Sequence, residues 1–367
     1  MNHPVWIAVA AVLGAVIGSF LNACIYRMPR GISLRDPERS FCPACRKLIP
    51  WYENLPVVSW LVLRGRCSGC GEKISIRYPL VELLVAGLFV AAWQIYRMPL
   101  APVYWVLLSL LVAATFIDIE HFIIPDEITW GGTAAGIVLS LLVPGMMGTD
   151  SRLAAGGLSL AGAALGFGLL WLVVEGGKLA FGKKRHRFAA GTAFTWTRDG
   201  DRADLVVGDD TLRWEDIFSR ESDVLLLECA EIEIDGEKVP TGGHAKFHYD
   251  RITSGTDVRA LDDLQVIRGT LEGIVIPREA MGFGDVKFIA AIGAFLGWQA
   301  VLFTIFASSV IGCLAGLAGL FLAKDRSGAR IPFGPFLALG AAWWIFGGKA
   351  LFDWYLGLFG NRSPIPF

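Results

Sequence analysis

Two aspartates occupy positions where acidic residues are rare, at the edges of long apolar segments. Asp118 ends one such segment, and Asp285 begins another, directly after Gly282-Phe283-Gly284. A charge inside a bilayer costs up to about 2.5–3.5 kcal/mol, so such residues persist where they face a partner or water. Two carboxylates that share one proton can act as base and acid on one water molecule. The pair therefore predicts a hydrolytic site, with simple helix capping by each aspartate as the alternative.

Four cysteines form a second set, as two Cys-x-x-Cys pairs separated by 21 residues: Cys42 with Cys45, and Cys67 with Cys70. Four thiolates at this kind of spacing are typical of a tetrahedral structural zinc site. A polar block of about 50 residues has little core of its own, so a metal would stabilise its fold. Four thiolates leave no open coordination position, which argues against catalytic zinc.

The composition indicates whether these residues belong to a membrane protein or to a soluble one. The chain has 367 residues, of which 54% are hydrophobic and 18% charged, a mean hydropathy of +0.52 and a net charge of −1. Soluble domains are about 25% charged, so the sequence predicts a polytopic α-helical membrane protein. Nothing in it resembles the basic surface of a nucleic-acid-binding protein.

About eight apolar segments have lengths close to those needed to cross a bilayer. Lysine and arginine gather in the polar blocks after the first, fifth and seventh segments and are sparse in the other connections. Because positive charge stays inside, we expect both termini outside and both long polar blocks in the cytoplasm. The segments are 5–25, 79–96, 101–118, 127–146, 154–181, 286–298, 299–323 and 333–359.

The second long polar block differs in character from the first. Residues 189–276 carry 19 Asp/Glu against 9 Lys/Arg, and their apolar residues alternate as in strands. Asp235-Gly236 is typical of a two-residue hairpin turn. The sequence thus predicts an inserted acidic β-rich domain. His244 and His248 within it are expected to be solvated side chains and not metal ligands.

These patterns divide the chain into five parts. They are a first transmembrane helix (1–25), a cytoplasmic zinc-binding domain (26–78), transmembrane helices 2–5 with Asp118 (79–181), an inserted cytoplasmic β-rich domain (182–277), and transmembrane helices 6–8 with the Gly-Phe-Gly-Asp motif (278–367).

An ordered set of motifs across most of the chain resembles the type IV prepilin leader peptidase family, membrane aspartic proteases with a Gly-x-Gly-Asp motif. The set starts with Gly18-Ser19-Phe20-Leu21-Asn22 and the two cysteine pairs. It continues with 50–56, 77–82 and 118–126, and ends with the run 277–287. The resemblance implies that Asp118 and Asp285 are the catalytic carboxylates. Asp126, expected to cap the helix that follows it, ranks third, with Glu120 behind it.

The resemblance also implies substrates and a second activity. The family removes the leader of prepilin and pseudopilin precursors after a glycine, on the cytoplasmic side of the bacterial inner membrane. Its members also N-methylate the new N-terminus with S-adenosylmethionine, and the complete N-terminal block implies this activity here. No motif gives the methyl-donor site, and the neighbourhood of Glu53 and Asn54 is our expectation.

The insertion departs from the family pattern, because it places 167 positions between the two aspartates. It could capture basic leaders electrostatically, or it could be a solvated appendage. Two other functions remain open: a Gly-x-Gly-Asp intramembrane protease with other substrates, and a non-enzymatic zinc-stapled scaffold or transporter with acids along an ion path. The sequence does not determine the particular pilin or the oligomeric state.

Overall fold

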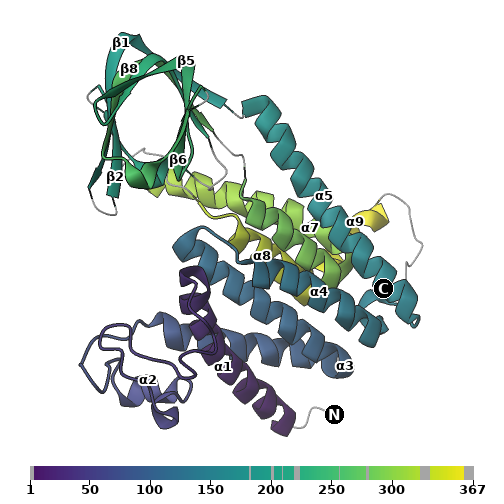
Figure 1. The fold of residues 1–367 in the computed structure, drawn as a ribbon. Coiled ribbons are helices and arrows are strands. Elements are labelled where there is room, and N and C mark those ends of the chain that lie inside the picture. Colours follow the sequence, from purple (N-terminus) through teal and green to yellow (C-terminus); the bar gives the residue numbers. More distant parts are fainter. Residues whose placement is uncertain are drawn as a thin grey trace. The chain divides into compact units, whose positions relative to one another are not determined.

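The computed structural model describes residues 4–181, 183–199, 202–208, 210–218, 224–255, 257–277, 281–322 and 331–358. The chain forms two compact units (Figure 1). The first contains Met1–Leu172 and Met281–Phe367, and the second contains Val173–Ala280. The basic connection expected at 324–330 lies outside the described residues.

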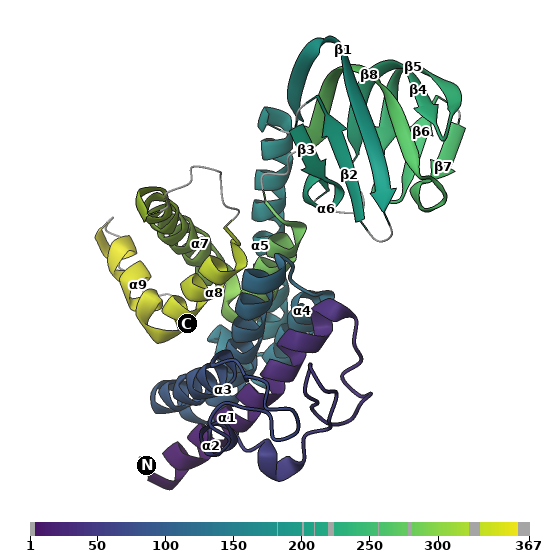
Figure 2. The ribbon, with the colours of Figure 1, turned by 90° about the vertical axis from the view of Figure 1, so that its left-hand side faces the viewer.

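The first unit is built from helices (Figures 1 and 2). Among the described residues, five helical stretches are long and apolar enough to cross a membrane, which fits a multi-pass membrane protein. The helices are α1 (Pro4–Arg27), α2 (Val58–Val62), α3 (Arg77–His121), α4 (Asp126–Leu142), α5 (Arg152–Phe181), α7 (Phe283–Leu322), α8 (Gly334–Trp343) and α9 (Lys349–Leu358). Short helical turns are η1 (Met28–Arg30), η2 (Trp51–Glu53), η3 (Pro144–Met147) and η5 (Trp344–Gly348).

The 45-residue helix α3 is interrupted near its middle. Arg97 and Met98 have non-helical backbone angles, and Arg97 lies in the left-handed region at φ 52°. The two halves run back along each other, because Arg77 at one end forms an ion pair with Glu120 at the other. The rings of Phe89 and Trp105 stack between the halves with centroids 5.0 Å apart. The separate segments predicted at 79–96 and 101–118 correspond to these halves.

Helix α7 contains a similar break at Gly297, whose φ of 79° favours glycine. Residues eight apart in a continuous helix are separated by about 12 Å. Here a β-carbon built on Gly293 would lie 2.8 Å from Val301 Cγ2. The chain therefore turns sharply at Gly297, and the expected segments 286–298 and 299–323 lie on its two sides.

The second unit is an eight-stranded antiparallel sheet in the order β3-β2-β1-β8-β4-β5-β6-β7. Its first and last strands pair with each other, from Lys183 opposite Pro277, so the chain enters and leaves the sheet at neighbouring positions. The strands are β1 (Lys183–Asp199), β2 (Arg202–Val207), β3 (Asp210–Arg213), β4 (Leu225–Ile234), β5 (Glu237–Phe247), β6 (Arg251–Ser254), β7 (Asp257–Ala260) and β8 (Val266–Pro277). The short helix α6 (Trp214–Ile217) and the turn η4 (Leu261–Asp263) complete the unit.

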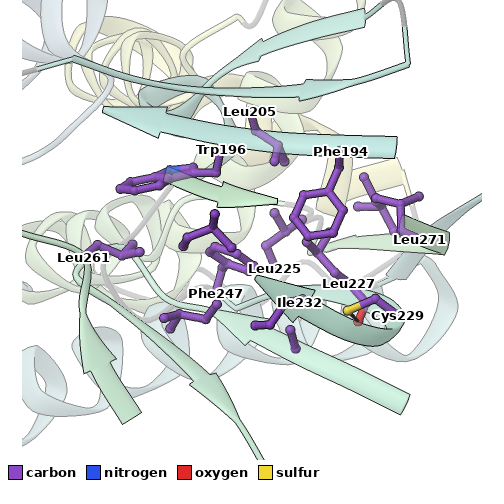
Figure 3. Close-up of a cluster of buried hydrophobic side chains, with 14 of the residues drawn as sticks. Phe194, Trp196, Leu205, Leu225, Leu227, Cys229, Ile232, Phe247, Leu261 and Leu271 are labelled. Atoms are coloured by element: carbon purple, nitrogen blue, oxygen red, sulfur yellow. Dashed lines mark hydrogen bonds between the residues drawn. The ribbon is translucent and has the colours of Figure 1, made fainter. Parts of the chain in front are cut away.

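The curved sheet encloses an apolar core that includes Phe194, Trp196, Leu227 and Phe247 (Figure 3). The predicted hairpin is confirmed: β4 and β5 are joined at Asp235-Gly236, and both residues have positive φ, as a two-residue hairpin turn requires. A bulge after Cys229 shifts the register of β4. Because side chains alternate along a strand, this extra residue moves the buried face from odd-numbered to even-numbered positions.

Helices α1 and α3 pack closely through small residues, as is common between membrane helices. A β-carbon built on Gly18 would lie 2.7 Å from the Cα atom of Glu82. A β-carbon built on Gly14, one turn earlier, would lie at the same distance from Ala86 Cα.

Replacing Gly18 with leucine should separate α1 from α3, because a backbone atom of α3 blocks the new side chain. Overpacking of this kind costs about 1–3 kcal/mol, so the melting temperature in detergent should fall. Gly87→Leu on α3 is the control, since nothing lies within 4 Å of its β-carbon position. Equal melting temperatures for the two variants would contradict this packing.

Candidate functional site

Asp118 lies in the last turn of α3 and is only 5% exposed. Its Oδ2 atom accepts a hydrogen bond of 3.0 Å from the backbone N–H of Gly334, the first residue of α8. A β-carbon built on Gly334 would lie 2.6 Å from the same oxygen. Only glycine therefore allows the start of α8 to approach this carboxylate. Asp118 thus accepts a hydrogen bond from the N-terminal end of α8, as a helix-capping side chain does, although Asp118 and Gly334 are 216 residues apart in the sequence.

Asp285 lies in the first turn of α7 and is 7% exposed. Its backbone N–H donates to the carbonyl of Gly282 at 3.1 Å. A β-carbon built on Gly282 would lie 3.4 Å from Asp285 Oδ2, so the absence of a side chain at this position leaves the space beside the carboxylate open. The carboxylate is thus held at the N-terminal end of a helix, where the dipole favours negative charge.

Ile124, in the loop between α3 and α4, links the surroundings of the two aspartates. A β-carbon built on Gly284 would lie 3.4 Å from Ile124 Cβ, and one built on Gly334 would lie 2.9 Å from Ile124 Cδ1. Gly284 precedes Asp285, and Gly334 is bonded to Asp118. One buried side chain therefore touches the backbone next to both carboxylates, and the ends of α3, α7 and α8 converge on it.

Asp126 is placed differently from the expectation that it caps α4. Pro125 occupies the cap position, and no side-chain cap hydrogen bond is made. Instead, Asp126 Oδ1 accepts a 2.6 Å hydrogen bond from Lys287 Nζ, two residues after Asp285. The Lys287 ammonium also lies 5.3 Å from the ring centroid of Phe283. The Asp126 carboxylate therefore links the start of α4 to the start of α7.

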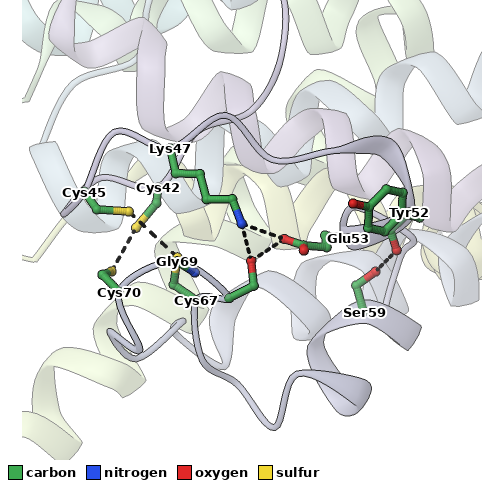
Figure 4. A network of polar contacts seen from close by, with 10 residues as sticks. Cys42, Cys45, Lys47, Tyr52, Glu53, Ser59, Cys67, Gly69 and Cys70 are labelled. Atoms are coloured by element: carbon green, nitrogen blue, oxygen red, sulfur yellow. Dashed lines mark hydrogen bonds and ion pairs between the residues drawn. The ribbon is translucent and has the colours of Figure 1, made fainter.

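Glu120 also has a partner, since it forms an ion pair with Arg77. Both residues line a cavity of about 500 Å³ between α1, the start of α3 and the cysteine-containing block. Glu53 and Asn54 line the same cavity. Glu53 accepts a 2.5 Å hydrogen bond from Ser68, which in turn accepts one of 2.9 Å from Lys47 (Figure 4).

The four predicted cysteine ligands are brought together. Their sulfur atoms all lie within 4.8 Å of one another, with 3.9 Å between Cys42 and Cys70 and 4.0 Å between Cys45 and Cys67 (Figure 4). These distances are too long for disulfides. They are close to the roughly 3.8 Å expected between sulfurs placed 2.3 Å from a tetrahedral zinc ion. Among the described residues, no other cluster of possible metal ligands has this form.

The two halves of this cluster have matching backbones. The N–H of Cys42 donates to Lys47 and that of Cys67 to Glu72, each at 2.9 Å. The backbone N–H groups of Cys70 and Gly69 lower the pKa of the Cys67 thiol to about 6, which favours the thiolate that a metal needs. The residues present therefore fit a tetrahedral ion held by four sulfurs.

The sequence reasoning missed Ile124 and Gly334 as parts of the site. An apolar loop residue carries no chemical signal of its own. Gly334 lies in Pro332-Phe333-Gly334-Pro335 at the start of an apolar segment, a pattern that marks a helix beginning but not what it approaches. The two histidines of the insertion differ in environment: His244 is exposed, whereas partial burial lowers the pKa of His248.

Comparison with known proteins gives the family to which the chain belongs. The bacterial peptidase A24 N-terminal domain matches residues 12–96, and the type IV leader peptidase family matches residues 105–198 and 264–317. The chain therefore belongs to the type IV leader peptidase family. No solved structure matches it.

Several curated relatives are named prepilin leader peptidase/N-methyltransferase. The one from Neisseria gonorrhoeae is 37% identical over 49% of this chain and 68% of its own length. The one from Myxococcus xanthus is 42% identical over 53% of this chain and 57% of its own length. The one from Aeromonas hydrophila is 29% identical over 93% of this chain and 90% of its own length.

Asp126→Ala should leave a folded protein with at least partial peptidase activity. The Asp126 side chain is 64% exposed, and exposed ion pairs contribute only about 0–1 kcal/mol. Thermal unfolding in detergent and a cleavage assay would measure both effects, with Asp353→Ala, which breaks the exposed pair with Lys349, as the control. A well-folded variant without activity would place Asp126 among the reacting groups.

Proposed function

We propose that this protein is a membrane aspartic endopeptidase that removes the leaders of type IV prepilins and pseudopilins and then methylates the new N-terminus. The observation that carries the proposal is that Ile124 lies beside two glycines that adjoin buried acids: Gly334, which is hydrogen-bonded to Asp118, and Gly284, which precedes Asp285. The relatives' names and the family membership support the same activities.

In this mechanism the two carboxylates share one proton. One carboxylate accepts a proton from water, which then attacks the carbonyl carbon of the leader's last glycine, while the other, protonated, donates to the carbonyl oxygen. The C–N bond then breaks: the first carboxylate gives its proton to the leaving amine, which becomes the new N-terminus, and the second recovers a proton as the glycine carboxyl group forms. The hydrogen bond from Gly334 fixes the orientation of Asp118, and the first turn of α7 fixes that of Asp285. The absence of a side chain at Gly282 leaves room for an extended substrate backbone beside Asp285.

We further propose eight membrane spans with both termini outside and the active site facing the cytoplasm of the bacterial inner membrane. The spans are α1, the two halves of α3, α4, α5, the two parts of α7 separated by Gly297, and α8 with α9. The sharp turns in α3 and α7 support this count. The distribution of lysine and arginine supports the orientation.

S-adenosylmethionine, which supplies a transferable methyl group, would bind in the cavity lined by Glu53 and Asn54. A volume of about 500 Å³ is within the range of small-molecule sites. The Glu53 carboxylate and the Asn54 amide suit amino and hydroxyl groups. Glu120, two residues after Asp118, lines the same cavity. A newly released N-terminus would therefore have a short distance to travel from the acids.

Replacing Asp118 or Asp285 with asparagine should abolish leader cleavage. An amide can neither accept nor donate the shared proton, and general acid–base catalysis is worth about 10²–10⁴-fold. The measurement is loss of the leader from a purified prepilin, followed by gel mobility with protein in detergent. Asp126→Asn is the matched control. Wild-type cleavage by either of the first two variants would exclude the aspartic mechanism, whereas a wild-type protein that cleaves no prepilin would leave a scaffold or transporter.

We also propose that the cysteine cluster binds one structural zinc ion. Elemental analysis should find about one zinc per chain, and none after Cys42 and Cys45 are both replaced by serine. Cys313→Ser is the control, because Cys313 is exposed and lies outside the cluster. Zinc loss should reduce methylation more than cleavage, since the acids lie on helix ends. A wild-type protein free of zinc would contradict the proposal.

A further inference from the structure

One stretch of the cysteine-containing block, residues 51–62, exposes an unusual amount of apolar surface. It contains η2 and α2. Trp51 is 73% exposed, Val58 54%, Leu61 62% and Val62 74%. Val58, Leu61 and Val62 recur at helical spacing on one face. A contiguous apolar surface of this kind on a polar block indicates something that covers it.

Contacts with α3 show how far residues 51–62 lie from the polar end of the spanning helices. The backbone N–H of Val57 donates to Glu82 Oε2 at 2.7 Å, and Glu82 is buried against α1 at Gly18. Glu82 lies five residues inside α3 from Arg77, which is about 7.5 Å along the helix. The start of α2 is therefore level with the interior of the helix pair and not with its polar end.

Contacts with α1 lead to the same conclusion. Val16 and Phe20 of α1 line a cavity of about 450 Å³ together with Trp51, Leu55 and Pro56. Val16 precedes Arg27, the last residue of α1, by eleven positions, or about 16 Å. In both Figures 1 and 2, α2 lies beside α1 and not beyond its C-terminal end. The stretch thus folds back along the part of α1 that is apolar enough to cross a membrane.

The spanning helices α1 and α3, which contact this stretch, also expose apolar side chains. Phe20 of α1 and Leu80 and Leu83 of α3 are all exposed. Beyond α2 the chain becomes basic, with exposed Arg64 and Arg66. Tryptophan at the boundary, an apolar helix face and arginines beyond it are typical of a segment lying in a membrane interface.

We propose that residues 51–62 are embedded in the boundary between headgroups and acyl chains of the bilayer leaflet that contacts the cysteine-containing block. In this placement, lipid covers the exposed apolar side chains. The arginines that follow then meet anionic headgroups. This placement holds the block, and the cavity of about 500 Å³ beneath it, at the membrane surface. It does not depend on the proposed catalytic roles of the aspartates.

Photocrosslinking from single positions tests this placement. The full-length protein carries p-benzoylphenylalanine at Val62, or at Tyr52, where an exposed aromatic ring is already present. It is reconstituted into nanodiscs of phosphatidylethanolamine and phosphatidylglycerol, irradiated and examined by mass spectrometry. Leu172, exposed on the candidate span in α5, is the positive control. Glu272, exposed on β8, is the negative control.

We expect lipid adducts at Val62 and Tyr52 several-fold above those at Glu272 and comparable to those at Leu172. Zinc content and melting temperature, matched to the wild type, select correctly folded samples. Adducts at the Glu272 level from both positions would overturn the proposal. A crosslink to a second copy, or to prepilin only when it is added, would overturn it in favour of a protein occupant.

Discussion

The candidate site depends on one close approach, that of the α8 backbone to the Asp118 carboxylate. The hydrogen bond from the Gly334 N–H exists only because residue 334 has no side chain to occupy the position of the oxygen. The same absence lets Ile124 reach the start of α8 while it touches the backbone before Asp285. Burying two acids is costly. The N-terminal end of α8 stabilises Asp118 through the Gly334 N–H, and the N-terminal end of α7 stabilises Asp285.

The second unit can be inserted without changing this arrangement. Its first strand, β1, and its last strand, β8, pair with each other, so the chain leaves the unit close to the position at which it enters. Its core is formed by its own strands together with α6 and η4, so its folding and that of the helices of the first unit are separable. The separation of the two aspartates by 167 positions therefore need not alter the site.

The cysteine-containing block has few buried apolar residues, so polar contacts hold its loops together. One set of contacts is the cluster of four cysteine sulfurs. Another is made by the buried Arg27, which donates hydrogen bonds to the backbone carbonyls of Ser33, Pro37 and Arg39. Glu82 ties the block to α3. These polar contacts enclose the larger cavity and leave an apolar face uncovered, and a bilayer would supply the missing cover.

The sequence by itself determined the apolar segments, the cysteine pairs, the hairpin at Asp235-Gly236 and the two candidate acids, because these signals are local periodicities, spacings and turn residues. Only the tertiary structure decided that Asp126 pairs with Lys287 and does not cap α4, that a bulge after Cys229 reverses the buried face of β4, and that Ile124 and Gly334 complete the site. Each of these depends on residues far apart in the chain, or on one extra residue in a strand. Close packing between helix ends leaves no periodic trace in the sequence, so it becomes visible only when the chain is folded.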